Sequence, residues 1–135
     1  MKILFVCKAN VGRSQIAEAL YNKYTNSKDA FSAGTIAKES GKKIKEHNRT
    51  DFVLDVLDEE GIDIKNHKIK KLTREMVNKA DKIIVLTDLE SWPHYLKNSQ
   101  KVEYWDIKDG KGKDYNFHKR MIKNIKNKIK EFLRK

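Results

Sequence analysis

Short apolar runs alternate with helical patterns along this chain, and that alternation limits the folds that it can adopt. Four runs have the apolar or β-branched character of strands, and they lie at residues 2–6, 30–34, 82–87 and 101–107. Strands that alternate with helices form right-handed βαβ units, which assemble into a mostly parallel sheet with helices on both faces. The sequence therefore predicts an α/β fold in which ligands bind beyond the carboxyl ends of the strands.

Helical patterns lie between and after these runs. They predict helices over residues 14–25, 51–62, 72–81 and 89–96 and from about residue 117 onward. Thr50 and Thr73 are the expected N-caps of the second and third helices, and Gly61 is expected at the end of the second. Spacings of four and three predict one apolar stripe on the last helix, formed by Phe117, Met121, Ile125, Ile129 and Phe132.

The composition fits a single packed domain over residues 1–135. A chain of 135 residues is long enough for one hydrophobic core and too short for two, and no linker rich in proline, glycine or serine divides it. No segment approaches the roughly 20 apolar residues that span a bilayer, and the first apolar run is too short for a secretory signal. We therefore expect a cytoplasmic protein that has no membrane partner.

The charge is strongly positive, with 30 basic residues against 19 acidic ones and a formal net charge of +11. Such an excess suggests anionic partners, of which nucleic acid is the obvious one. Most of the excess is lysine on amphipathic helices, notably the last, where a solvated face accounts for it. We therefore favour a solvated surface over a polyanion-binding face and do not expect a nucleic-acid partner. The four histidines lack the spacing of metal ligands, and no metal or other cofactor is expected.

The segment from Cys7 to Ser14 joins the first strand to the first helix and has the residues of an anion site. Backbone N–H groups in such a turn converge above the strand end, where the helix N-terminus adds positive potential. Arg13 can offer a planar fork of donors to two oxygens of a phosphate-like anion. Gly12 suits a tight turn, and Asn10 can hold an unusual backbone conformation. Ser14 can donate a hydrogen bond to the sulfur and stabilise it as a leaving group.

Cys7 is the only cysteine, which excludes an intramolecular disulfide and a metal site of clustered cysteines. A lone cysteine that ends a buried strand is usually a small, inert apolar residue. The combination Cys-x5-Arg-Ser between a strand and a helix is much more specific, because the positive field of the loop favours the thiolate. We therefore interpret Cys7 as a nucleophile and Arg13 as the clamp for an oxyanion.

With these residues the chain resembles the low-molecular-weight protein tyrosine phosphatase superfamily, which also contains a class of arsenate reductases. The stretches that carry the resemblance cover essentially the whole chain: residues 7–14, "SAGT" at 32–35, "EEGID" at 59–63, "KKLT" at 70–73 and "ADKIIVLT" at 80–87. The resemblance implies a four-stranded parallel sheet flanked by helices, and phosphomonoester hydrolysis through a cysteinyl-phosphate without a metal. It also implies a phosphate-binding loop after the first strand, in which Lys8, Ala9, Asn10, Val11, Gly12 and Ser14 surround the substrate.

A thiolate that attacks phosphorus needs a proton for the departing oxygen, because an alkoxide or phenoxide leaves poorly. The family uses an aspartate in a loop after the fourth strand, usually followed by proline. Asp109 occupies the matching place here, with Gly110 where proline is usual, and we expect Asp109 to be the general acid. Asp106 and Asp114 remain alternatives, since the glycine-containing loop can be aligned in more than one way.

Two departures from the family bear on the substrate. The phosphotyrosine enzymes commonly have an aromatic residue directly after the aspartate-proline pair, whereas this chain has Gly110 and then Lys111. Gly12 stands where eukaryotic-type members have a second cysteine, so oxidised Cys7 would be restored only by external thiols. The expected substrate is a phosphorylated protein or a small phosphomonoester, with inorganic phosphate or arsenate as a competing anion.

Two alternatives to a phosphatase remain open. Arsenate resembles phosphate, so the loop could bind it and Cys7 could attack arsenic; reduction would then need an external small thiol, because the chain has no further cysteine. The second alternative is a binding protein for phosphorylated or polyanionic partners that does not turn them over. The presence of a nucleophile and an acid favours an enzyme, since binding alone requires neither.

Overall fold

The computed structural model describes residues 1–47 and 51–135. Along the chain the strands and helices are β1 (Ile3–Cys7), α1 (Arg13–Thr25), β2 (Ala30–Gly34), α2 (Asp51–Glu59), α3 (Arg74–Lys79), β3 (Lys82–Val85), α4 (His94–Lys97), β4 (Val102–Tyr104) and α5 (Tyr115–Leu133), with 3₁₀ turns at Ile44–Glu46 and Leu89–Ser91. None of the described helices is long and apolar enough to cross a membrane.

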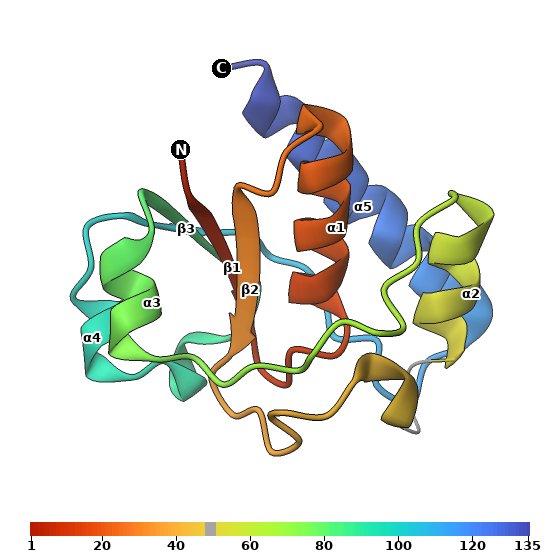
Figure 1. Ribbon diagram of the computed structural model, residues 1–135, viewed down its shortest axis with the longest axis horizontal. Coiled ribbons are helices and arrows are strands. Elements are labelled where there is room, and N and C mark those ends of the chain that lie inside the picture. The colour runs from red at the N-terminus through yellow and green to blue at the C-terminus, as the bar shows by residue number, and fades with distance from the viewer. Residues whose placement is uncertain (48–50) are drawn as a thin grey trace.

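The described strands form a four-stranded parallel sheet in the order β2-β1-β3-β4. Helices α1, α2 and α5 lie on one side of it and α3 and α4 on the other (Figure 1). The predicted α/β fold with helices on both faces is therefore confirmed. Because β1 lies between β2 and β3, the chain leaves it toward one neighbour and later returns beside it on the other side. Ligand sites of open α/β sheets lie at such a change of direction, and the loop after Cys7 starts there.

Alternate residues of the central strand face the two layers of helices. Ile3 and Phe5 belong to the core cluster shared with α1 and α5, whereas Leu4 and Val6 belong to the cluster shared with α3 and α4. All four side chains are buried, as expected for a parallel strand covered on both sides. The unbroken apolar run that predicted the first strand therefore has a direct cause in the two packed faces.

The structure corrects the predicted helix at 89–96. A 3₁₀ turn ends at Ser91, Trp92 is extended, and α4 begins only after Pro93. Proline disfavours the helical conformation in the residue before it, so one continuous helix cannot form here. The predicted strands at 82–87 and 101–107 are also too long, because pairing ends at Val85 and Tyr104.

The other predicted helix ends mostly agree with the structure. The Thr73 side chain caps α3 by accepting a hydrogen bond from the Met76 N–H at 3.2 Å. Helix α2 ends at Glu59, and Gly61 follows it with a φ of 76°, a conformation that glycine adopts without strain. The expected cap at Thr50 lies outside the described residues. On α5, Met121, Ile125 and Ile129 are buried as predicted.

Helix α5 begins two residues earlier than the apolar stripe indicated, at Tyr115. The Asp114 carboxylate caps it by accepting a hydrogen bond from the Phe117 N–H at 2.8 Å. One turn into the helix, the buried His118 ring uses Nδ1 to bond the Asp114 carbonyl oxygen at 2.8 Å. The His118 ring also packs directly on Gly110, where an added Cβ would lie 2.6 Å from Nε2. The close approach of this imidazole explains why the turn before α5 has glycine at that position.

Replacing Gly110 by alanine should therefore destabilise the fold. We expect Gly110→Ala to lower the free energy of unfolding by about 1–3 kcal/mol, because either the loop or the buried ring must move. Urea denaturation of Gly110→Ala, His118→Ala and the double variant measures this in a double-mutant cycle. The loss from Gly110→Ala should shrink once the ring is gone. An equal loss in both backgrounds would contradict the proposed clash.

Candidate active site

Cys7 is the last residue of β1, and α1 begins at Arg13, so the intervening turn lies at the carboxyl end of the sheet. Gly34 of β2 pairs with Cys7 and lies against the turn: a Cβ there would be 2.5 Å from the carbonyl oxygen of Lys8. Backbone bonds from Thr35 to Cys7 and from Ile36 to Lys8, at 2.9 and 2.8 Å, continue this close pairing beyond the strand. The absence of a side chain at Gly34 therefore allows the turn to lie directly on β2.

A buried asparagine holds the turn in shape. Asn10 has a φ of 61°, the left-handed conformation that asparagine tolerates better than most residues, which is the unusual conformation expected from the sequence. Its Nδ2 donates to Ser14 Oγ at 2.8 Å and to Ser32 Oγ at 3.0 Å. Its Oδ1 accepts from Gln15 Nε2 at 3.0 Å and from the Lys70 backbone N–H at 2.8 Å. The amide is thereby fully bonded and fixes the path of the loop.

Two groups of the loop contact the cysteine sulfur. Ser14 Oγ lies 2.9 Å from Cys7 Sγ, and the backbone N–H of Asn10 donates to the same sulfur at 3.3 Å. Asn10 Nδ2 donates to Ser14 Oγ, and the serine hydroxyl is the donor to the sulfur whenever Cys7 is a thiolate, because a thiolate can only accept. Both groups lie where they can donate hydrogen bonds to the sulfur when it attacks or leaves.

Arg13 is buried and held by two backbone carbonyls. Its Nη1 donates to the carbonyl oxygen of Leu86 at 2.5 Å and to that of Ile107 at 3.0 Å. These carbonyls follow β3 and β4, so the guanidinium is fixed at the carboxyl ends of both strands. Its Nη2 lies 4.0 Å from Asp109 Oδ2, beyond hydrogen-bond distance. The charged group is thus positioned through one nitrogen while the other stays on the side of Asp109.

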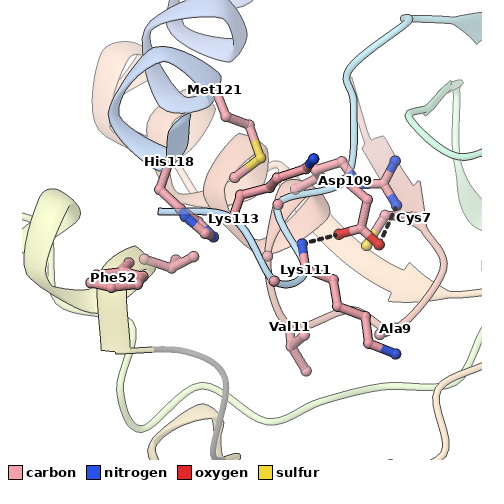
Figure 2. Close-up of a pocket in the computed structure, with 14 residues that line it drawn as sticks. Cys7, Ala9, Val11, Phe52, Asp109, Lys111, Lys113, His118 and Met121 are labelled. Carbon is pink, nitrogen blue, oxygen red and sulfur yellow. Dashed lines mark hydrogen bonds and ion pairs between the residues drawn. The ribbon is translucent and has the colours of Figure 1, made fainter. Parts of the chain in front are cut away.

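Asp109 lies at the mouth of a cavity of about 290 Å³ that Cys7 and Arg13 also line. Its side chain is 57% exposed, and its Oδ1 accepts the Lys111 backbone N–H at 3.1 Å. Figure 2 shows this carboxylate directed toward the arginine and the sulfur. We call this space the Cys7 cavity.

The other two candidate acids lie elsewhere. Asp114 caps α5, and Asp106 lies beside Tyr104 and Lys108, at 3.4 and 3.3 Å. Neither is among the residues that line the Cys7 cavity. Of the three aspartates considered from the sequence, the structure brings Asp109 to the cysteine.

The residues of the predicted binding loop divide into three groups. Ala9, Val11 and Gly12 line the Cys7 cavity together with Cys7 and Arg13. Asn10 and Ser14 are buried beneath it and act on the loop and the sulfur. Lys8 is exposed and lines a neighbouring cavity instead. The loop backbone and Arg13 therefore face the cysteine, while the lysine points outward.

The far side of the Cys7 cavity is apolar and comes from distant helices. Phe52 and Val53 of α2 and Met121 of α5 line it, together with His118 (Figure 2). The Phe52 ring is partly exposed and packs on His118, with their ring centroids 5.5 Å apart. Phe52 could not be predicted as a residue of the site, because no local sequence pattern indicates that α2 reaches the loop after β1.

The residues that support the loop between β1 and α1 were also not predicted from the sequence. Ser32 connects Asn10 to Glu18. Its Oγ accepts a hydrogen bond from the Asn10 amide, and its hydroxyl donates to the Glu18 carboxylate at 2.7 Å. Gln15 donates to both Asn10 and the carbonyl of Lys68, at 3.0 Å each. Burial lowers the pKa of the Lys70 ammonium, and the Glu18 carboxylate partly offsets that change. The stretch "SAGT", which contains Ser32 and Gly34, was the available signal for this support.

Comparisons with known proteins agree with this fold. Over 132 residues the chain is 28% identical to arsenate reductase 2 of Staphylococcus haemolyticus, covering 96% of this chain and 94% of that protein. The low molecular weight protein tyrosine phosphatase of T. tengcongensis superposes with a TM-score of 0.80 at 25% identity, covering 99% of this chain and 98% of that one. Wzb of Vibrio vulnificus, solved with benzylphosphonate, has the same fold, with a TM-score of 0.84 at 23% identity over 97% and 95% of the two chains.

The family comparison covers nearly all of the sequence. Residues 2–135 match the model of the family described as low molecular weight phosphotyrosine protein phosphatase. The matched range includes the loop from Cys7 to Arg13 and the loop that contains Asp109. The chain therefore belongs to the low molecular weight phosphotyrosine protein phosphatase family.

Proposed function

We propose that this protein is a metal-independent cysteine phosphatase that hydrolyses phosphomonoesters through a cysteinyl-phosphate. The observation that carries the proposal is the meeting of Cys7, Arg13 and Asp109 at one cavity, with the sulfur bonded by Ser14 and the Asn10 N–H. A nucleophile, a fixed cation and a carboxyl group are the three groups that this chemistry needs.

The reaction starts with attack of the Cys7 thiolate on phosphorus. The S–P bond forms while the bond from phosphorus to the ester oxygen breaks, and protonated Asp109 gives that oxygen its proton. The Asn10 N–H remains on the sulfur. Arg13 and the other N–H groups of residues 8–13 bind the equatorial phosphoryl oxygens, where charge is concentrated during transfer. The site is pre-formed for this role because the arginine is already held by the carbonyls of Leu86 and Ile107.

Hydrolysis of the intermediate uses the same groups in reverse. The Asp109 carboxylate takes a proton from a water molecule, whose oxygen attacks phosphorus as the S–P bond breaks. The sulfur leaves as a thiolate, stabilised by the Ser14 hydroxyl at 2.9 Å, and inorganic phosphate is released.

The apolar side of the cavity supports an aryl or otherwise apolar group next to the phosphate. Phe52, Val53 and Met121 form this wall. An aromatic side chain therefore lies at the cleft even though Gly110 and Lys111 leave the aspartate loop without one. Among phosphomonoesters, this wall favours phosphotyrosine in proteins as the substrate.

Arsenate reduction is the second candidate, because curated relatives such as that of Staphylococcus haemolyticus are named arsenate reductases. Here the Cys7 thiolate would form an S–As bond while an As–O bond breaks and the departing oxygen leaves as water. One external small thiol would then attack the Cys7 sulfur, so that the S–As bond breaks, its electron pair reduces As(V) to As(III), and a mixed disulfide with Cys7 remains. A second small thiol would free Cys7 and leave the two small thiols joined as a disulfide. External thiols are required because Cys7 is the only cysteine of the chain.

Substitutions of the nucleophile and the acid should separate these functions. With p-nitrophenyl phosphate, a reductant and no added metal, we expect Cys7→Ser to abolish turnover. Asp109→Asn should lower kcat about 10²–10⁴-fold, the range that a positioned general acid contributes. Absence of turnover by folded wild-type protein would overturn the phosphatase proposal. Arsenate reduction with small-thiol donors would then be measured, and failure of both activities would favour the binding-only alternative.

Asp114 provides the matched control for the choice of acid. Asp114→Ala should lower the free energy of unfolding by about 1 kcal/mol through loss of the α5 cap, whereas Asp114→Asn should retain the cap. Thermal or urea denaturation measures the first effect, and p-nitrophenyl phosphate kinetics should be nearly unchanged in Asp114→Asn. A loss of kcat in Asp114→Asn as large as that in Asp109→Asn would assign the acid to Asp114 instead.

A further inference from the structure

A second cavity of about 380 Å³ adjoins the Cys7 cavity. Ala9, Val11 and Lys111 line both of them, so these residues form a shared wall. Figure 2 shows the Lys111 side chain extending from the aspartate loop toward Ala9. A molecule with its phosphate at Cys7 can therefore extend across this wall into the second space, which we call the lysine cavity.

The lysine cavity has an excess of positive charge. Lys8 and Lys38 line it together with Lys111, and all three are exposed. Within the described parts of the chain, none of these ammonium groups forms an ion pair with a carboxylate. Some other lysines do pair with acidic residues, as Lys126 does with Glu60. The three charges thus remain available to an anion from outside.

Glu39 is the one carboxylate among the residues that line the lysine cavity, and it is already engaged. His47 bonds one of its oxygens, and Lys42 Nζ lies 3.4 Å from the other. The hydrogen bond from His47 and the nearby Lys42 charge together hold the pKa of Glu39 below its ordinary value. Because Glu39 is engaged by these partners, the three lysines determine the electrostatic potential in the lysine cavity.

We propose that the lysine cavity is a second anion subsite, which binds an acidic side chain next to the phosphorylated residue of a peptide substrate. This inference rests on the proposed phosphatase function and names its substrate class. A peptide is favoured over a small bisphosphate because the lining is also apolar, with Ile36 42% exposed at the lysine cavity and Val11 in the shared wall. A peptide backbone and its neighbouring side chains can use these apolar contacts while one carboxylate meets the lysines.

The test compares two phosphotyrosine peptides that differ only in the residues flanking the phosphotyrosine, glutamate in one and glutamine in the other. We expect wild-type kcat/KM to be about two- to tenfold higher for the glutamate peptide, as for a few solvent-exposed charge contacts. The ratio should fall toward one as ionic strength rises, because salt screens exposed charges. Using the ratio within each protein cancels any general change in turnover.

Charge variants test whether the lysine cavity causes the preference for the glutamate peptide. Lys38→Glu should bring the ratio to one or below, and Lys38→Arg should keep it, since arginine preserves the charge. Lys128→Glu is the matched control, because Lys128 is an exposed lysine of α5 that lines neither cavity and its replacement changes the net charge equally. Equal ratios for the wild type and Lys38→Glu would overturn the subsite, as would the same loss in Lys128→Glu.

Binding to the Cys7→Ser protein keeps this inference separable from the proposed function. Lack of p-nitrophenyl phosphate hydrolysis by the wild type bears on the phosphatase proposal alone. Equal affinity of Cys7→Ser for the two peptides would overturn the acidic subsite, even in an active phosphatase. Equal turnover of both peptides but tighter binding of a small bisphosphate would also overturn it and would assign the cavity to a second phosphate.

Discussion

The buried amide of Asn10 joins three separate parts of the fold at the base of the loop between β1 and α1. It bonds α1 through Ser14 and Gln15, β2 through Ser32, and the segment before α3 through the Lys70 backbone. A buried hydrogen bond contributes about 1 kcal/mol, but a buried polar atom left without its partner costs about 1–3 kcal/mol. Loss of this amide would therefore leave several buried groups unpaired at once. The left-handed backbone at Asn10, and with it the direction of the loop N–H groups, depends on that network.

Arg13 connects the loop to the other half of the sheet, through hydrogen bonds to the segments that follow β3 and β4. A buried guanidinium is expensive unless its donors are satisfied, and the carbonyls of Leu86 and Ile107 satisfy one nitrogen. Those carbonyls are free to accept because strand pairing has ended at Val85 and Tyr104. Strands β3 and β4 are shorter than the sequence predicted, and the chain beyond each of them directs a carbonyl toward Arg13.

The sequence predicted the sheet, the helices and the cysteine loop because these depend on local patterns. Apolar runs marked the strands, and the capping residues Thr73 and Gly61 marked helix ends. Contacts between segments far apart in the chain left no such pattern. Phe52 reaches the Cys7 cavity, and His118 packs on Gly110, only because α2 and α5 pack side by side beside the loop. The role of Asp114 as the cap likewise depends on where α5 begins, which the apolar stripe placed two residues late.

The site combines a rigid part with a looser one, and the difference follows from how each is bonded. Cys7, Asn10 and Arg13 are buried and held by several hydrogen bonds each. Asp109 is more than half exposed, and its contacts are one backbone N–H and an arginine nitrogen at 4.0 Å. In the proposed mechanism, a phosphoryl group at Arg13 would take up that arginine nitrogen, and Asp109 would face the leaving oxygen. The proposed nucleophile and its loop are thus held by several hydrogen bonds within the protein, whereas fewer contacts hold the proposed acid.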